Sequence, residues 1–156
     1  MNYRRTSYTL ARDTVGRPME ILLVEDDLED AGLTIEALRE GGIPCRVSLV
    51  RDGEEALEFL LRLGRYRRAP VPDLILLDLN LPKKDGREVL AEMRADGQLE
   101  RIPVVVLTSS RIHEEIVRSE HLRVEDYLTK PVDFDAFLNV VKSLRKYMLA
   151  DVILPQ

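Results

Sequence analysis

The chain has 156 residues, 45% of them hydrophobic and 33% charged, with a formal net charge of −5. This length and composition fit one soluble globular domain, and the acidic balance disfavours non-specific nucleic-acid binding by the whole molecule. No apolar stretch is long enough to span a membrane, and the polar N-terminal residues lack the apolar core of a secretory signal. The single cysteine, Cys45, cannot form an internal disulfide, which fits a reducing compartment, so a cytoplasmic location is expected.

Short apolar runs alternate with helix-period segments along the chain. Strands are predicted at 19–24, 46–50, 74–77, 103–107 and 124–128, and helices at 28–40, 54–63, 87–95, 112–121 and from 134 onward. Uninterrupted apolar runs are typical of strands that are covered on both faces, and strict alternation indicates right-handed crossovers. The sequence therefore predicts an α/β fold, a doubly wound five-stranded parallel sheet with helices on both faces.

The predicted domain organisation is an N-terminal arm at 1–18, one domain at 19–148 and a C-terminal tail at 149–156. Asp27, Asp52 and Asp133 are expected to cap the first, second and last helices, and Gly41 with Gly42 to end the first. The stretch 64–72 is predicted to be a loop. Its surroundings carry Arg62, Arg65, Arg67 and Arg68. We expect a solvated charged loop there rather than a nucleic-acid site, because aromatic residues are scarce.

Polar side chains follow four of the predicted strands where each strand ends. Glu25 and Asp26 follow the first strand, Asp78 the third, Thr108 and Ser109 the fourth, and Lys130 lies just past the fifth. In open α/β sheets the carboxyl ends of parallel strands form the rim at which ligands bind. Mg²⁺ takes one or two carboxylates, waters and phosphate oxygens, and a carboxylate can form an acyl phosphate when a metal organises the donor. The sequence therefore predicts a site that holds Mg²⁺ and takes up a phosphoryl group.

Within this site, Asp78 is the predicted phosphoacceptor. The expected Mg²⁺ ligands are Asp26, Asp78 and the backbone carbonyl of Asn80, with Glu25 acting through a metal-bound water. Lys130 is expected to pair with Asp78 before the reaction and with a phosphoryl oxygen afterwards.

The remaining site residues are small or flank the lysine. A cis peptide bond before Pro131 would aim Lys130 into the pocket. Thr108 offers a hydroxyl to the phosphoryl group, and Ser109 is small enough to leave the approach open.

This pattern resembles the receiver domain of two-component response regulators. The matching motifs are VEDD at 24–27, LLDLNLPKKDG at 76–86, VVLTSS at 105–110 and DYLTKP at 126–131. The resemblance implies a flavodoxin-like receiver fold, Mg²⁺ as cofactor and a histidine kinase as the phosphoryl donor to Asp78. It also implies that Thr108 and Tyr127 move inward together on phosphorylation and switch the surface formed by the fourth helix, fifth strand and last helix.

A finer resemblance is carried by DLNLPKKDG and by the ending RKYMLADVILP. Both are similar to the stand-alone regulators paired with bacterial and cyanobacterial phytochromes, which implies a phytochrome-type kinase and a homodimer. The implied dimer contacts are Tyr147, Met148, Val152, Ile153, Leu154 and Pro155. Because few residues follow the last helix, no DNA-binding or enzymatic output domain is expected. Output then passes to a downstream protein or a phosphotransfer partner.

Besides a signalling receiver, two other classes of protein remain as alternatives, an enzyme and an interaction module. A phosphatase or aspartyl-phosphate hydrolase usually carries a second aspartate two residues after the nucleophile, but that position is Asn80. Ser110 brings no amide or carboxylate to orient a water, so only slow self-dephosphorylation is expected. A phosphorylation-independent dimeric interaction module is the third class, and against it no residue of the predicted site is missing.

Overall fold

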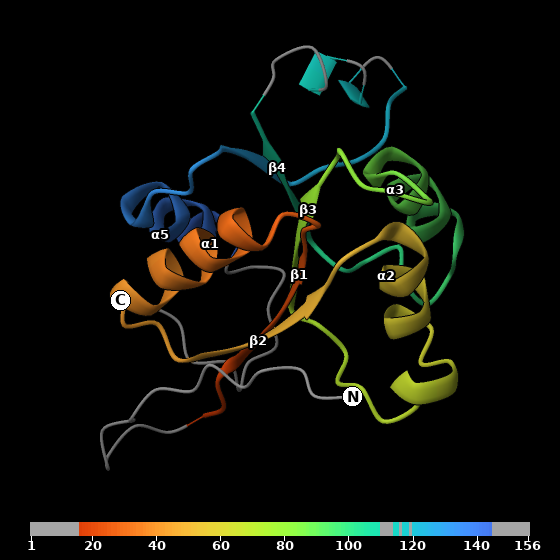
Figure 1. The fold of residues 1–156 in the computed structure, drawn as a ribbon, viewed down its shortest axis with the longest axis horizontal. Coiled ribbons are helices and arrows are strands. Elements are labelled where there is room, and N and C mark those ends of the chain that lie inside the picture. The colour runs from red at the N-terminus through yellow and green to blue at the C-terminus, as the bar shows by residue number, and fades with distance from the viewer. Residues whose placement is uncertain (1–15, 110–113, 116, 119, 145–156) are drawn as a thin grey trace.

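The computed structural model describes residues 16–109, 114–115, 117–118 and 120–144. Its centre is one sheet of five strands, β1 (Met19–Val24), β2 (Cys45–Val50), β3 (Leu74–Asp78), β4 (Val104–Thr108) and β5 (Asp126–Thr129), in the order β2-β1-β3-β4-β5. Every neighbouring pair is parallel. The predicted doubly wound parallel sheet is confirmed (Figure 1).

Helices cover both faces of this sheet. Figure 1 shows α1 (Leu28–Glu40) and α5 (Phe134–Ser143) on one side, and α2 (Gly53–Leu60) and α3 (Gly86–Ala95) on the other. Residues 114–115 and 117–118 are helical, within the predicted fourth helix, whose remaining residues lie partly outside the described part. A short 3₁₀ helix, η1 (Gly64–Tyr66), follows α2.

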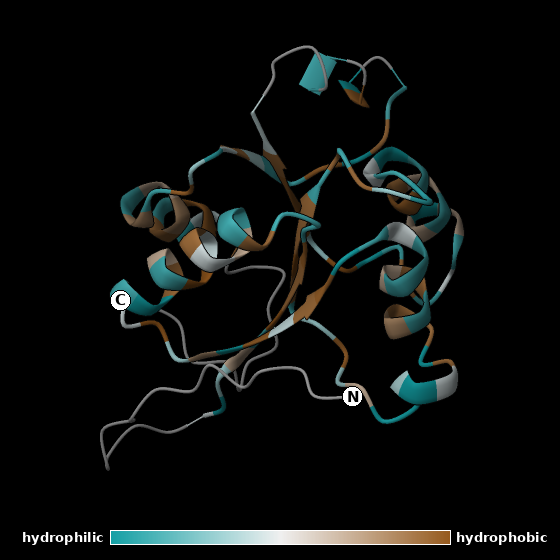
Figure 2. Cartoon of the chain, viewed as in Figure 1, coloured by the Kyte–Doolittle hydropathy of each residue, from teal (hydrophilic) through white to brown (hydrophobic). Residues whose placement is uncertain are grey.

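The core divides into two layers because successive strand residues point to opposite faces. In β1, Leu22 and Val24 pack in the layer under α2 and α3, whereas Ile21 and Leu23 pack in the layer under α1 and α5. Every residue of β3 and β4 is buried, which explains their uninterrupted apolar sequences. Figure 2 shows this hydrophobic centre between helices whose outer faces are polar.

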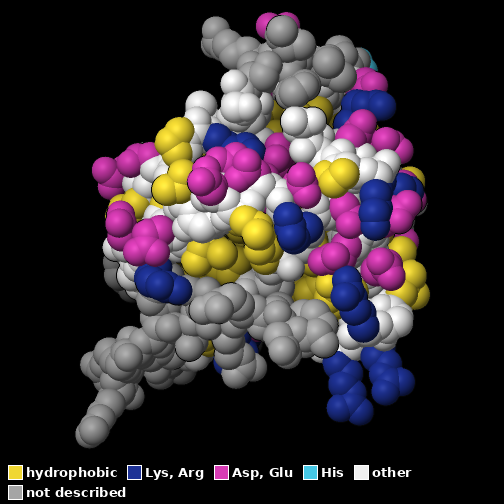
Figure 3. All heavy atoms as spheres, viewed as in Figure 1, with side chains coloured by type: hydrophobic (Ala, Val, Ile, Leu, Met, Phe, Trp, Pro, Cys, Tyr) yellow, Lys and Arg dark blue, Asp and Glu magenta, His cyan; other side chains and the backbone are white. Residues whose placement is uncertain are grey.

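On the face seen in Figure 3, acidic and basic side chains are interspersed and hydrophobic side chains form separate small groups. Single exposed hydrophobic residues are ordinary for a folded domain. The exposed large hydrophobic side chains among the described residues are Leu28, Leu33, Leu61, Leu63 and Val71.

The predicted helix caps are confirmed. Asp27 accepts hydrogen bonds from two backbone N–H groups at the start of α1, and Asp52 and Asp133 each accept one at the starts of α2 and α5. Gly41 ends α1, and Gly42 has φ of +65°, in the left-handed region that glycine adopts easily.

Several predicted boundaries were wrong by one to three residues. β4 begins at Val104 rather than at 103, because Pro103 has no N–H to donate to the sheet. β5 begins at Asp126 rather than at 124; just before it, the Glu125 N–H donates to the Val104 carbonyl at 2.9 Å and the Glu125 side chain accepts the Val104 N–H at 2.6 Å. α2 ends at Leu60 rather than at 63, since Arg62 has φ of +58° and leaves the helix. β2, β3 and α3 each extend one residue beyond their predicted bounds.

The predicted loop at 64–72 is more ordered than expected. Tyr66 is buried, its hydroxyl donates to Glu55 Oε1 at 3.0 Å, and its ring lies 5.2 Å from that of Phe59. Burial and the Glu55 hydrogen bond raise the pKa of Tyr66 to about 12. The four arginines predicted to be solvated are exposed.

The ends of the chain are only partly described. Arg17, inside the predicted arm, donates to both carboxylate oxygens of buried Asp73 at 2.7 and 2.8 Å, so this residue of the arm contacts the domain. The predicted dimer contacts lie outside the described residues, as does Ser110. They are Tyr147, Met148, Val152, Ile153, Leu154 and Pro155. Within the described ranges, no helix is long and apolar enough to cross a membrane.

Candidate functional site

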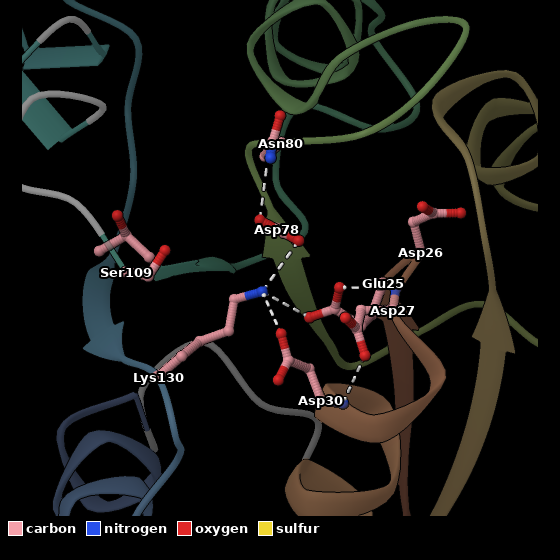
Figure 4. Close-up of a pocket in the computed structure, with 9 residues that line it drawn as sticks. Glu25, Asp26, Asp27, Asp30, Asp78, Asn80, Ser109 and Lys130 are labelled. Atoms are coloured by element: carbon pink, nitrogen blue, oxygen red, sulfur yellow. Dashed lines mark hydrogen bonds and ion pairs between the residues drawn. The ribbon is translucent and has the colours of Figure 1, made fainter.

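A pocket of about 240 Å³ opens at the carboxyl ends of β1, β3 and β4. It is lined by Glu25, Asp26, Asp27, Asp30, Asp78, Asn80, Thr108, Ser109 and Lys130. The seven residues predicted to surround a metal and a phosphoryl group are all in this set (Figure 4). The parallel register brings them together, because strands that run the same way end at the same edge.

Asp78 ends β3, and its side chain is only 8% exposed. Its Oδ1 accepts the Asn80 N–H at 3.0 Å, and its Oδ2 accepts from Lys130 Nζ at 3.0 Å. The loop after it packs tightly, since a Cβ on Gly86 would lie 2.4 Å from the Asp78 carbonyl oxygen. The Asp78 carboxylate is therefore held in one orientation by the backbone on one side and a cation on the other.

Lys130 reaches the pocket from the turn after β5, where its peptide bond to Pro131 is cis, as expected. Besides Asp78, its Nζ donates to Glu25 Oε1 at 2.8 Å and to Asp30 Oδ2 at 3.2 Å. Asp30 was not among the residues predicted for this site, and the structure places it in the pocket. No sequence signal relates it to Lys130, which is 100 residues away.

Burial sets the electrostatics of this cluster. Burial raises the pKa of Glu25 to about 7, with the Lys130 hydrogen bond lowering it and the Asp78 carboxylate raising it further. Burial lowers the pKa of Lys130, but its hydrogen bonds with Glu25 and Asp78 outweigh burial and raise it. The ammonium therefore stays charged at neutral pH, and the pocket contains more carboxylates than cations.

In metal-free buffer, the titration of Glu25 is expected to lower the free energy of unfolding as pH rises from 4.5 to about 7. In this window folded Glu25 keeps its proton and the unfolded chain loses it, so the folded state binds more protons and loses stability as pH rises. Denaturant unfolding across the window measures this slope. Glu25→Gln should flatten it, whereas Glu29→Gln, an exposed control on α1, should not. Identical slopes in wild type and Glu25→Gln would contradict the prediction.

The oxygen donors of this pocket are of the chemical type that Mg²⁺ prefers, but they do not form a complete coordination shell. Within the described ranges, no three acidic, histidine or cysteine side chains converge as a metal cluster. The Asp26 side chain is 51% exposed and points away from Lys130 (Figure 4), while Arg51 donates to its backbone carbonyl at 3.0 Å. Mg²⁺ needs only one or two carboxylates and keeps several waters. Asp26, Asp78 and the Asn80 carbonyl, with Glu25 through a water, supply such hard oxygen donors.

A second pocket, of about 350 Å³, adjoins the first and shares Thr108 and Ser109 with it. Tyr127 lines it, half-buried against the core layer under α2 and α3. The Arg118 guanidinium lies 4.5 Å from the centre of the Tyr127 ring and pairs with Glu114 at 2.9 Å. Sequence reasoning missed Arg118 and Glu114, although their i, i+4 spacing on a helix favours such a pair.

Comparison with known proteins agrees with this geometry. The model of the response regulator receiver domain matches residues 21–142. The chain belongs to this family. It is 45% identical over 143 residues to the response regulator Rcp1 of Synechocystis sp., covering 92% of this chain and 97% of that protein.

Solved structures place this response regulator beside phytochrome-associated relatives. The bacteriophytochrome response regulator AtBRR is 41% identical with a TM-score of 0.79, over 90% of this chain and 99% of that one. The phosphorylated cyanobacterial phytochrome response regulator RcpA is 47% identical with a TM-score of 0.70, over 89% and 99%. The Mn²⁺-bound form of Rcp1 is 45% identical with a TM-score of 0.69, over 89% and 100%. The predicted receiver fold and the finer resemblance to phytochrome-associated regulators are confirmed.

Proposed function

We propose that Asp78 of this response regulator accepts a phosphoryl group from a histidine kinase with Mg²⁺ as cofactor. The observation that carries the proposal is the Asp78 carboxylate itself, nearly buried at the end of β3 and 3.0 Å from Lys130 Nζ in a pocket rich in carboxylates. A phosphorylated relative and an Mn²⁺-bound relative add support, because both share over 40% identity with this chain.

In the proposed reaction, an Asp78 carboxylate oxygen forms a bond to phosphorus as the bond from phosphorus to the kinase histidine nitrogen breaks. The Asn80 N–H, 3.0 Å from Oδ1, orients the carboxylate. Lys130 transfers its hydrogen bond from Asp78 to a phosphoryl oxygen. Mg²⁺ held by Asp26, Asp78 and the Asn80 carbonyl would supply the positive charge that offsets phosphoryl charge during transfer, as metal ions do in phosphoryl transfer generally. Glu25 would act on that ion through a water.

In the same proposal, Thr108 and Tyr127 couple phosphorylation of Asp78 to the output surface. A phosphoryl group adds about two negative charges and several strong acceptors, and the Thr108 hydroxyl is a donor at the shared wall of the two pockets. Movement of Thr108 toward the phosphoryl group opens space for Tyr127, which must then leave its contact with Arg118. The output surface is formed by the predicted fourth helix, β5 and α5.

The partners follow from the relatives' names and remain part of the proposal. AtBRR and RcpA are named as phytochrome response regulators, so we infer a phytochrome-type histidine kinase as donor. A downstream protein or phosphotransfer partner receives the signal. Homodimerisation through the C-terminal tail stays a prediction.

Incubation with acetyl phosphate and Mg²⁺ is expected to add one phosphoryl group to the wild type, and none to Asp78→Asn, because the amide is not a nucleophile for phosphorus. Intact mass measures the addition, which should be lost when Mg²⁺ is chelated. Asp135→Asn removes an exposed carboxylate from α5 and should leave uptake unchanged. Equal uptake by Asp78→Asn would contradict the assignment. No uptake by the wild type would favour the phosphorylation-independent interaction module.

A further inference from the structure

The Lys130 ammonium is shared by three carboxylates rather than held by Asp78 alone. Its Nζ donates to Glu25 at 2.8 Å, to Asp78 at 3.0 Å and to Asp30 at 3.2 Å. An ammonium group carries three hydrogens, so these contacts use its full donor capacity. Figure 4 shows Asp30 approaching Lys130 from α1, on the side opposite Asp78. Asp30 and Asp78 therefore compete for one cation.

We propose that Asp30 is a positioning residue that determines how much of the Lys130 charge reaches Asp78. This inference rests on the proposed function. A phosphoryl group on Asp78 brings about two negative charges that need the same ammonium. The Asp30 carboxylate draws the ammonium toward α1 and repels the phosphoryl group, so it favours the pocket that holds Mg²⁺ alone over the pocket that also holds a phosphoryl group.

The position of Asp30 is set by the start of α1. Its backbone N–H donates to the Asp27 side chain at 3.1 Å, which places it in the first helical turn. Its side chain is 40% exposed, against 8% for Asp78 and 1% for Glu25. Water screens an exposed ion pair much more than a buried one. The Asp30 contact is therefore the weakest of the three, and it adjusts the balance of the pocket without controlling it.

Asp30→Asn keeps the shape of the side chain and removes its charge, with opposite expected effects on two ligands. Binding of Mg²⁺ should weaken, because one attracting carboxylate is lost and Lys130 pairs more fully with Asp78 and Glu25. Binding of beryllofluoride, an anionic mimic of the phosphoryl group, should strengthen at saturating Mg²⁺. Each change should be about two- to fivefold, as expected for a partly exposed ion pair.

Two variants serve as controls. Glu29→Gln removes the same charge from the same turn of α1, where its exposed side chain lies outside the residues lining the pocket. Both affinities should stay at the wild-type values in this variant. Asp30→Glu keeps the carboxylate on a longer side chain and should restore the wild-type balance at least in part.

Titration calorimetry with MgCl₂, and the thermal shift produced by beryllofluoride, measure the two affinities. Opposite shifts in Asp30→Asn that are absent in Glu29→Gln support the inference. A fall in both affinities would mean that Asp30 only stabilises the pocket, and two unchanged affinities would mean that it does not act on Lys130. Either result would overturn the inference about Asp30. The proposed function would stand as long as the wild type binds Mg²⁺ and beryllofluoride. A wild type that binds neither ligand would refute the proposed function as well.

Discussion

Lys130→Met is expected to tighten Mg²⁺ binding by about tenfold, or about 1.4 kcal/mol. In the wild type, Lys130 Nζ lies between the Glu25 and Asp78 carboxylates, 2.8 and 3.0 Å from their oxygens. Charges a few ångströms apart interact by several kcal/mol even at an effective dielectric of about 20, so loss of the ammonium leaves these carboxylates free for the divalent ion. Without metal, the free energy of unfolding should fall by about 3 kcal/mol, because nearly buried carboxylates lose their cation.

Calorimetric titration with MgCl₂ and denaturant unfolding, with and without Mg²⁺, test both parts of this prediction. Lys142→Met removes a charge from an exposed position on α5, and neither quantity should change in this control. Added Mg²⁺ should restore most of the stability lost in Lys130→Met. An Mg²⁺ affinity equal to that of the wild type would show that Lys130 does not compete with the metal.

Arg94→Leu is expected to lower the free energy of unfolding by about 3 kcal/mol, since it breaks a buried ion pair by removing one partner. The Arg94 side chain is 11% exposed and donates to Glu125 Oε1 at 3.0 Å. It also donates to the backbone carbonyls of Glu100, Ile102 and Arg123 at 2.8 to 3.0 Å. Its loss removes the buried cation from a carboxylate that is 3% exposed, leaves that carboxylate with Arg123 and the Val104 N–H, and leaves three carbonyls without this donor.

Arg123 provides a matched control, because it pairs with the other oxygen of Glu125 at 3.0 Å but is 54% exposed. Arg123→Leu should cost no more than about 1 kcal/mol, the range of exposed pairs. Denaturant unfolding of the two variants measures the difference. Similar losses in both would contradict the view that burial makes the Arg94 contact the stronger one.

The architecture could be predicted because local signals agree with one another along the chain. The apolar runs of β1, β3 and β4 have no polar interruption, which indicates strands covered on both faces. The helices begin after aspartates whose side chains cap them, as at Asp27 and Asp133. These features depend on residues close in sequence, so pattern alone was sufficient.

The start of β5 could not be predicted in the same way. Val124 and Glu125 look like strand residues by composition, but the Glu125 carboxylate accepts the Val104 N–H and pairs with Arg94, 31 residues earlier. Tyr66 is a similar case, because it is buried with its hydroxyl bonded to Glu55, which lies on a helix 11 residues before it. Such contacts between separate elements have no short-range signature in the sequence.

The candidate site also combines residues that the sequence predicts with a contact that it does not. Glu25, Asp78 and Lys130 follow strands, and their meeting at one rim follows from parallel topology. Asp30 lies inside a helix, where an acidic residue in the first turn already has an ordinary explanation in the helix dipole. Only the three-dimensional arrangement shows that its carboxylate reaches Lys130.

The most direct test of the central claim is to locate the phosphoryl group within the chain. After phosphorylation with acetyl phosphate and Mg²⁺, borohydride reduces an aspartyl phosphate to homoserine, and peptide mass spectrometry then identifies the modified residue. We predict homoserine at position 78 and at no other aspartate in the chain. Homoserine at another position, or phosphorylated protein without homoserine at 78, would contradict the assignment of Asp78 as the phosphoacceptor.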